Sequence, residues 1–421
     1  MLPMSTPETV KTERPGSLEE TLREVVERLA PIDRTPCSAG EREAAVWLAE
    51  RLRAVNGVEV ALEEEPSWGT FPPTATGLGV LGIFAAALVL RGRRFAGALL
   101  AAGGLAGIVD EAQNGPRILR RLVRRRRGTV NLIARLGEPR AGDEHEPVGT
   151  LVVIAHHDAP QTGFLFDQTL QRKLHERAPQ VLERFRTPLP QWWVGLAGPL
   201  LTIAAALSRR LGLARAAIAV GALGTAIVAD VWRNETVQGA NDNLSGVAAL
   251  VGLAELLTAS PVAGMRVLLV SCGAEETLQD GIRAFMASHR HELAPEQTWF
   301  VNLDTVGSPH LVMLEAEGPV WMESYNGPWL RDLVAERADA LEIELFRGFR
   351  ARASTDSIIP SRAGYPIATL VSMTDWRSPA NYHLPSDVPA NLDYGSVARA
   401  TRLVYELART LAEKNGRPLP T

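Results

Sequence analysis

The chain has 421 residues, which is long enough for one large domain or for a core domain with insertions. Its formal net charge of −4 gives no global field that would favour nucleic acid as a partner. The two cysteines, Cys37 and Cys272, are too few for a disulfide-stapled scaffold.

The first 16 residues are polar and lack the apolar core of a secretory signal. We expect a disordered lead over residues 1–16. Helices should follow, because Ser17–Glu20 and Ser38–Glu41 each fit a capping box ahead of residues with helical apolar spacing. They predict helices over about 17–29 and 38–55.

Strand and helix patterns then alternate along the chain. Short apolar or alternating runs predict strands at 58–62, 130–134, 150–155, 265–271, 299–303 and 366–371. Segments with helical spacing predict helices at 245–257, 280–290, 328–341 and 396–411. This alternation predicts an α/β fold whose central sheet has helices on both faces. In such folds, binding sites form at the carboxyl ends of strands.

Two hydrophobic insertions, residues 66–127 and 159–238, interrupt this core. Each holds two apolar stretches joined by a basic turn, so each resembles a helical hairpin. The stretches are residues 74–90, 95–109, 192–207 and 216–229. At about 14–17 residues they are short for membrane spans, but they are almost free of charge on every face.

Tryptophans flank the second pair of stretches, as interface anchors would (Trp192, Trp193 and Trp232). We therefore expect membrane association through both hairpins, as a multi-pass protein. Basic residues lie at the hairpin tips and also in the return segment 117–127, so the positive-inside rule favours neither side. The lack of a signal peptide favours a cytoplasmic catalytic domain.

A histidine and an aspartate follow the expected strand at 150–155, in the motif Ala155-His-His-Asp158. His156 can bind a metal ion through one ring nitrogen. Asp158 can accept a hydrogen bond from the other nitrogen, which fixes the tautomer. The motif is weak by itself, because a histidine at a strand end is more often structural.

Two further motifs supply carboxylates. In the loop at 239–246, Asp242 is either the N-cap of the next helix or a bridging metal ligand, since a carboxylate has two oxygens. In the motif Gly273-Ala-Glu-Glu276, the adjacent carboxylates repel each other, so burying both requires a compensating cation. We expect Glu276 to bind a metal ion and Glu275 to act as the general base.

The last two candidates are Asp304, which closes the expected strand at 299–303, and His383 in the loop Tyr382-His-Leu-Pro-Ser-Asp387. Alone, each is more often structural. Together the motifs supply one histidine and one carboxylate for each of two metal ions, and one shared aspartate. Zinc accepts such ligands and keeps a position open for water. Cobalt or manganese would also fit this donor set.

The order and wording of these motifs resemble the two-zinc aminopeptidase family that includes bacterial leucyl aminopeptidases, aminopeptidase Y and, more distantly, glutamate carboxypeptidase II. The resemblance implies a peptidase core at 17–65, 128–158 and 239–421, with the zinc exopeptidase fold and its mixed central sheet. It implies that His156 and Asp304 bind one Zn²⁺ and that Asp242 bridges to a second. It assigns the second Zn²⁺ to Glu276 and His383.

The resemblance also implies release of N-terminal residues from peptides by attack of a water that bridges the zinc ions. Glu275 would be the general base, and Asp158 would hold a ligand in place. Two departures stand out. His157 occupies a place where the family usually has a tyrosine, which makes it a misleading third candidate ligand. Asp356 lies where the family often has a Ser-Asp pair, so it is a candidate substrate contact.

Other functions remain open at this stage. A carboxypeptidase would use the same centre, because the sequence does not show which peptide terminus is held. A glutaminyl cyclase of the same fold would use one zinc ion. A non-catalytic membrane scaffold is a third alternative, although the complete ligand set argues against it. The second insertion begins after Asp158 and ends before Asp242, so we expect it near the mouth of the active site.

Overall fold

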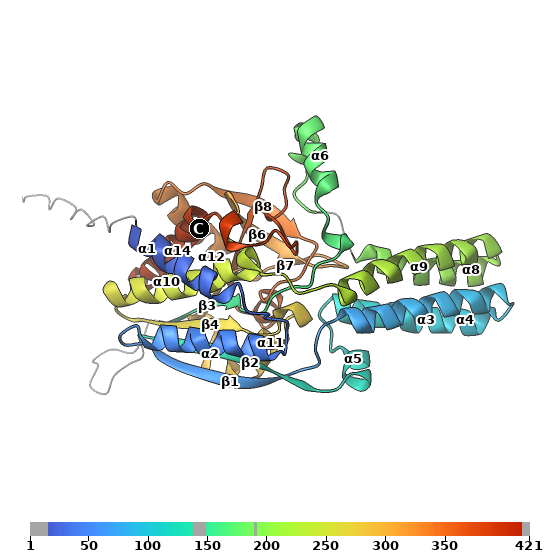
Figure 1. The fold of residues 1–421 in the computed structure, drawn as a ribbon, viewed down its shortest axis with the longest axis horizontal. Coiled ribbons are helices and arrows are strands. Elements are labelled where there is room, and N and C mark those ends of the chain that lie inside the picture. Colours follow the sequence, from blue (N-terminus) through green and yellow to red (C-terminus); the bar gives the residue numbers. More distant parts are fainter. Residues whose placement is uncertain (1–15, 138–148, 189–191, 415–421) are drawn as a thin grey trace, which may run out of the picture.

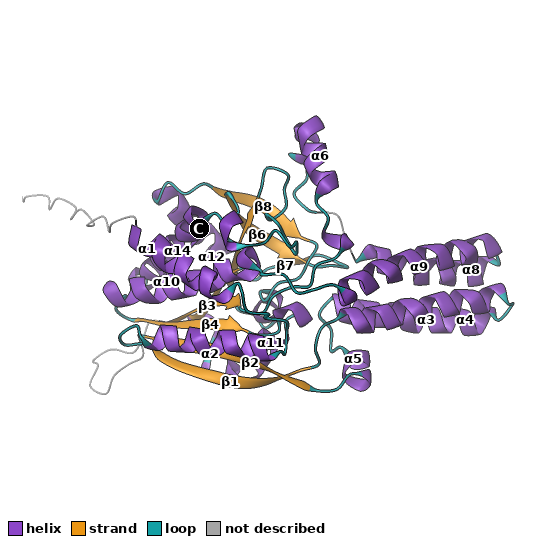
Figure 2. Cartoon of the chain, viewed as in Figure 1, coloured by secondary structure: helices purple, strands orange, loops and turns teal. Residues whose placement is uncertain are grey.

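A computed structural model of the protein describes residues 16–137, 149–188 and 192–414. The expected disordered lead therefore lies, apart from Gly16, outside the described residues. The architecture is an α/β core from which a group of long helices extends to one side (Figures 1 and 2).

Over the described residues, the core is built on a nine-stranded mixed sheet with the order β1-β2-β4-β3-β5-β9-β6-β7, in which β8 pairs with β6. The strands are β1 Glu59–Ser67, β2 Arg127–Leu136, β3 Gly149–His156, β4 Met265–Cys272, β5 Thr298–Leu303, β6 His310–Glu317, β7 Glu323–Ser324, β8 Leu345–Ala351 and β9 Ile367–Met373. The central strands β4, β3, β5 and β9 are parallel, while β2 and β6 pair antiparallel on either side. The predicted α/β class with a mixed sheet is confirmed.

Helices cover both faces of the sheet, as the sequence predicts. The larger apolar cluster lies between the sheet and five helices: α1 Gly16–Leu29, α2 Ala39–Arg53, α10 Ser245–Ala259, α12 Pro328–Ala340 and α14 Tyr394–Glu413. A second cluster lies on the opposite face, under α11 Asp280–His289 and α13 Ile358–Arg362. Strand β3 is buried along its whole length, which explains its continuous apolar run.

Three strands were not predicted, namely β6, β7 and β8. Strand β7 is only two residues long, and the other two carry charged residues that conceal the strand pattern. In β6, Glu315 accepts hydrogen bonds from Arg331 (2.9 Å) and Arg347 (2.9 Å). Both arginines come from later segments of the chain. The sequence around Glu315 therefore does not show that its charge is compensated.

The two insertions form one bundle of antiparallel helices that projects away from the sheet (Figure 1). Its helices are α3 Pro72–Leu90, α4 Arg94–Ala112, α8 Trp193–Ser208 and α9 Leu211–Arg233. Helix α3 packs against α4 and α9, and α8 packs against α9 and α4, so the two hairpins join side by side. Two smaller elements contact the bundle, α5 Ile118–Val123 and the 3₁₀ turn η1 Phe164–Phe166, whereas α6 Thr169–Arg177, followed by α7 Pro179–Leu182, projects away from it (Figure 1).

Helices α3, α4 and α9 are longer than the expected apolar stretches: α3 begins two residues earlier, at Pro72, whereas α4 and α9 continue through polar residues at the base. Helix α4 runs on through Glu111, which accepts hydrogen bonds from Arg120, and α9 runs on through Asp230, which accepts one from the N–H of Phe164. With 19, 19 and 23 residues, α3, α4 and α9 are long and apolar enough to cross a membrane, and α8 is a shorter apolar helix of 16 residues.

Candidate metal centre

The parallel strands bring most of the predicted residues to one edge of the sheet. Strand β3 ends at His156 and lies between β4 and β5, whose carboxyl ends lead into Glu275–Glu276 and Asp304. Asp242 comes from the loop that begins α10. Because carboxyl ends of parallel strands meet at one edge, side chains that are far apart in the sequence become neighbours there.

Asp242 lies between the two predicted histidine ligands. Its Oδ1 is 3.3 Å from Nε2 of His156, and its Oδ2 is 3.1 Å from Nε2 of His383. All three side chains are buried. A carboxylate that directs one oxygen at each of two imidazoles has the arrangement expected of a bridging ligand.

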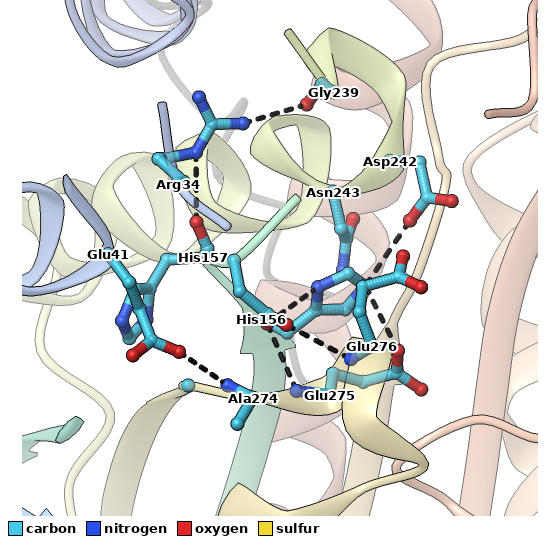
Figure 3. Close-up of polar contacts among 12 residues, drawn as sticks. Arg34, Glu41, His156, His157, Gly239, Asp242, Asn243, Ala274, Glu275 and Glu276 are labelled. Atoms are coloured by element: carbon cyan, nitrogen blue, oxygen red, sulfur yellow. Dashed lines mark hydrogen bonds and ion pairs between the residues drawn. The ribbon is translucent and has the colours of Figure 1, made fainter. Parts of the chain in front are cut away.

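Glu276 completes a group that could hold a metal ion. Potential ligand atoms of His156, Asp242 and Glu276 all lie within 4.8 Å of one another. The Oε1 of Glu276 is also 3.6 Å from Nε2 of His383. Figure 3 shows Glu276 and Asp242 directed toward the space beside His156.

Asp304 is buried at the end of β5, although it is not part of that three-residue group. Burial raises the pKa of its carboxyl to about 7. The charge of His156 opposes this shift and that of Asp242 adds to it, so Asp304 lies within electrostatic reach of both.

Asp158 is held behind His156 and faces the glutamate pair. Its Oδ1 lies 3.3 Å from Nδ1 of His156. Its two oxygens accept hydrogen bonds from the backbone N–H groups of Glu275 (3.1 Å) and Glu276 (3.0 Å). One carboxylate thus orients a histidine and both glutamates, which is a role typical of residues that support metal ligands.

Glu275 is buried next to the ligands. Its Oε2 is 4.0 Å from Nε2 of His156, and its Oε1 accepts a hydrogen bond from the side-chain amide of Gln279. Burial raises the pKa of Glu275 well above its usual value; the charge of His156 opposes the shift, while Asp356 and Asp304 add to it.

The chemistry of this group fits a cation. Burial raises the pKa of Glu276 and of Glu275 well above the usual range, and the negative charges of neighbouring carboxylates raise both further. Several carboxylates packed together away from water are unfavourable unless a positive charge compensates them. Two imidazoles combined with carboxylates form a donor set that suits Zn²⁺.

His157 does not belong to this group, although it sits beside His156 in the sequence. Its Nδ1 lies 2.9 Å from the hydroxyl of Ser271, and burial lowers its pKa to about 4. His157 directly follows β3, and its ring lies against Ser271 of β4, whereas His156, the last residue of β3, faces the carboxylates.

Asp356 is almost fully buried, with 1% of its surface exposed. Among the described residues neither of its oxygens has a hydrogen-bond partner, apart from the weakly donating Cys272 thiol nearby. Burial raises its pKa to about 7; His156 opposes this shift, and Asp158 adds to it.

Two supporting carboxylates were not singled out from the sequence. Glu41 accepts a hydrogen bond from the N–H of Ala274 (2.7 Å), directly before the glutamate pair (Figure 3). Asp387 accepts hydrogen bonds from the N–H groups of Asn241 (2.8 Å) and Asp242 (3.1 Å). Glu41 belongs to the predicted capping box and Asp387 to the His383 motif, so both lay within signals that the sequence offers.

A pocket opens at this centre. Its lining includes two candidate ligands and residues from the base of the bundle, namely Glu276, His383, Phe166, Phe71, Pro72 and Val231. Phe71 precedes α3, Pro72 begins α3, and Val231 lies in the last turns of α9. The expectation that the second insertion lies near the mouth of the site is consistent with this arrangement, and the first insertion contributes as well.

Comparisons with known proteins agree with this picture. Residues 224–408 match the model of peptidase family M28. The solved structure of an aminopeptidase from Aneurinibacillus sp. strain AM-1 superposes with a TM-score of 0.52 at 14% identity, covering 95% of this chain and 94% of that one. A leucine aminopeptidase precursor from Bacteroides thetaiotaomicron gives 0.52 at 13% identity, covering 93% and 96%.

A glutaminyl cyclase from an Acidobacteriales bacterium has the same fold, with a TM-score of 0.53 at 13% identity and coverage of 97% and 100%. At such identities these structures establish the fold alone. A search of curated proteins found no match to this chain.

Proposed function

From the match of residues 224–408 to the model of peptidase family M28, we propose that the protein is a two-zinc aminopeptidase. The observation that carries the proposal is the position of Asp242 between the Nε2 atoms of His156 (3.3 Å) and His383 (3.1 Å). A single shared carboxylate between two imidazoles is what a centre of two metal ions requires, whereas one ion needs no such bridge.

In this proposal His156 and Asp304 would hold one zinc ion, Glu276 and His383 would hold the other, and Asp242 would be shared by both. Bound zinc would supply a Lewis acid that polarises the scissile carbonyl and makes a water molecule more acidic. Asp304 stands outside the tight group of ligands, but it is buried at the same strand edge.

Glu275 is proposed as the general base. It would accept a proton from the attacking water and return that proton to the leaving amino group. Its carboxylate is anchored by the side-chain amide of Gln279 and its backbone by Asp158, so it is held in one place beside His156. Anchoring of this kind keeps a base at the distance that proton transfer requires.

The test measures the zinc content and the release of a chromophore from aminoacyl-anilides, for the wild type and for Glu275→Gln. Two zinc ions per chain, with turnover lost in the variant while metal is retained, would support both the mechanism and the base. Zinc without turnover of aminoacyl-anilides, but with release of the carboxyl-terminal residue from peptides whose amino terminus is blocked, would favour a carboxypeptidase. One zinc ion with cyclisation of glutaminyl peptides would favour a cyclase, and the absence of zinc would favour a scaffold.

We further propose that the bundle of α3, α4, α8 and α9 spans a membrane. In the most apolar windows of α3, α4 and α9, only 33%, 33% and 17% of the residues are buried inside the protein. The window of the comparably long Ala240–Ala259 segment is 78% buried, so that segment belongs to the core. Exposed apolar surface of this extent is unfavourable in water and favourable in lipid.

The chain topology agrees with a membrane-spanning bundle. A helix of 19 residues is about 28 Å long, close to the hydrocarbon thickness of a bilayer. Because each insertion crosses and returns, all three segments of the core lie on one side. Resistance of the full chain to extraction from vesicles by alkaline carbonate would support this, and release into the soluble fraction would contradict it.

A further inference from the structure

We infer that the preferred substrate of this centre is a peptide whose free amino terminus is held at the surface of the bilayer. The inference rests on the proposed aminopeptidase function and on the proposed membrane-spanning bundle. It concerns which peptides reach the centre, and it follows from how the base of the bundle meets the pocket.

The base of the bundle forms one wall of the pocket. Phe71 and Pro72, where α3 begins, and Val231, near the end of α9, line the same pocket as Glu276 and His383. Two of the helices proposed to enter the membrane thus meet the core beside this pocket, α3 at its start and α9 at its end. A peptide that binds in this pocket therefore lies close to the plane in which the bundle helices leave the core and would enter the membrane.

The 3₁₀ turn η1 connects the pocket with the exposed surface at the base of the bundle. The ring of Phe166 is buried and packs on His383, with their centroids 4.1 Å apart. Two residues earlier, Phe164 is 72% exposed, and its N–H donates to Asp230 of α9 (2.7 Å). One short turn therefore places one phenylalanine on a metal ligand and another on the surface at the base of the bundle.

The surface around the base has the composition of a membrane interface. Trp193 at the start of α8 and Trp232 near the end of α9 are about half exposed, and Leu122 and Val123 of α5 are more so. Helix α5 lies beside the base of the bundle in Figure 1, and the arginines 124–127 follow it. Aromatic residues with neighbouring arginines are typical of the headgroup region, where arginine attracts anionic lipids.

The bundle is also fixed relative to the centre. Arg117, which follows α4, forms a buried ion pair with Asp280, and Arg120 pairs with Glu111 of α4. Both arginines donate to the carbonyl oxygen of Thr277, the residue after the glutamate pair. Buried ion pairs of this kind are rigid, so the height of the pocket above the bilayer is set by the fold.

These relationships define the substrate. An amino terminus connected by a short polar spacer to a lipid-embedded segment would be delivered to the pocket at high effective concentration. A spacer that is too long would dilute that advantage, and one that is too short could not span the fixed distance. The wall contributed by Phe71, Pro72, Phe166 and Val231 is apolar and would favour an apolar side chain at the amino terminus.

The experiment uses the full chain in liposomes with one amino-terminal sequence in two forms, a soluble peptide and the same peptide joined to a membrane-spanning helix. Spacer lengths are varied in the joined series, and enzyme and joined peptide are also placed in separate vesicles. We expect at least a tenfold higher kcat/KM for the joined form in shared vesicles, with a maximum at one short spacer length. Equal rates, or a joined-form advantage independent of spacer length, would overturn the inference while leaving the aminopeptidase proposal intact.

A variant separates delivery from chemistry. Phe164→Asp places a charge at the surface of the base without altering any residue of the metal centre. It should lower turnover of the joined peptide severalfold and leave turnover of the soluble peptide unchanged. Leu341→Asp is the matched control. Leu341 is an apolar residue on the surface of the α/β core, 39% exposed, and its replacement should change neither rate. Failure to hydrolyse either peptide would overturn the proposed function itself, and with it this inference.

Discussion

Arg117 forms a buried ion pair with Asp280, and this contact joins the return segment of the first insertion to the loop that carries Glu275 and Glu276. Asp280 also accepts a hydrogen bond from the hydroxyl of Ser67 (2.6 Å), at the end of β1. The carboxylate therefore anchors three segments at once, next to the candidate centre.

Removal of the arginine should expose the importance of this pair for stability. Arg117→Ala leaves Asp280 buried without its partner, so we expect a loss of about 3–5 kcal/mol in the free energy of unfolding. Arg42→Ala, which removes an exposed ion pair with Glu64, should cost less than about 1 kcal/mol. Denaturant unfolding in detergent measures both. If the double variant with Asp280→Asn is no more stable than Arg117→Ala, the buried charge is not the cause.

The metal should stabilise the fold through Asp242. Zinc bound only to the native state at about a thousand times its dissociation constant contributes about 4 kcal/mol. Removal of zinc by a chelator should lower the melting temperature of the wild type, and Asp242→Asn should abolish this difference. Asp375→Asn, which alters an exposed partner of His310, should keep the full zinc effect. A zinc effect that survives in Asp242→Asn would contradict the bridging role.

Replacing Asp356 should have opposite effects on the stability of the metal-free protein and on the affinity for zinc. Its carboxyl is buried near other carboxylates, so Asp356→Asn should stabilise the metal-free protein by relieving repulsion. The same change should weaken zinc binding, because a nearby negative charge that attracts the cation is lost. Melting curves with chelator and with titrated zinc test both effects. An unchanged zinc affinity with a raised KM would instead support the substrate contact suggested by the sequence.

Glu317 should make the stability of the core depend on pH. Its carboxyl is fully buried and accepts hydrogen bonds from the hydroxyls of Tyr325 (2.6 Å) and Thr355 (2.8 Å). Burial raises its pKa to about 7, above the value of 4.5 expected in the unfolded chain. The native state therefore binds a proton that the unfolded state releases, so stability falls as the pH rises from about 4.5 to about 7.

Glu317→Gln should remove this dependence, since the amide oxygen still accepts hydrogen bonds and carries no charge. As the pH rises, the free energy of unfolding of the variant should increase relative to that of the wild type. The difference should reach up to about 3 kcal/mol at pH 8, which corresponds to the shift in the pKa of Glu317. Unfolding at pH 5 and pH 8 gives the comparison. Glu344→Gln, at an exposed position, should show no such gain. Parallel pH profiles for wild type and Glu317→Gln would disprove the prediction.

Much of the fold follows from local pattern. Strand β3 is buried on both faces, so its run of apolar residues is continuous and its end marks His156. Ser38 is the N-cap of α2, since its side chain accepts a hydrogen bond from the N–H of Glu41 (3.1 Å), while the Glu41 carboxylate accepts one from the N–H of Cys37 (3.0 Å). Patterns of this kind are visible because burial and capping act on residues that are near one another in the chain.

Other features depend on partners that lie far away in the chain. Strand β6 was missed because its glutamates are compensated by Arg331 and Arg347. The contact of Glu41 with the N–H of Ala274 joins residues more than two hundred positions apart, so its capping box gave no hint of a role near the centre.

The sequence by itself determined the α/β class, the candidate ligands and the two apolar hairpins, because each leaves a local pattern of residue type and spacing. Only the tertiary structure decided that His156 rather than His157 faces the carboxylates, and that Asp242 lies between two imidazoles. It alone placed Phe71 and Val231 in the wall of the pocket. The physical reason is that these arrangements arise from strand pairing and helix packing, which bring distant segments together at distances that no local pattern encodes.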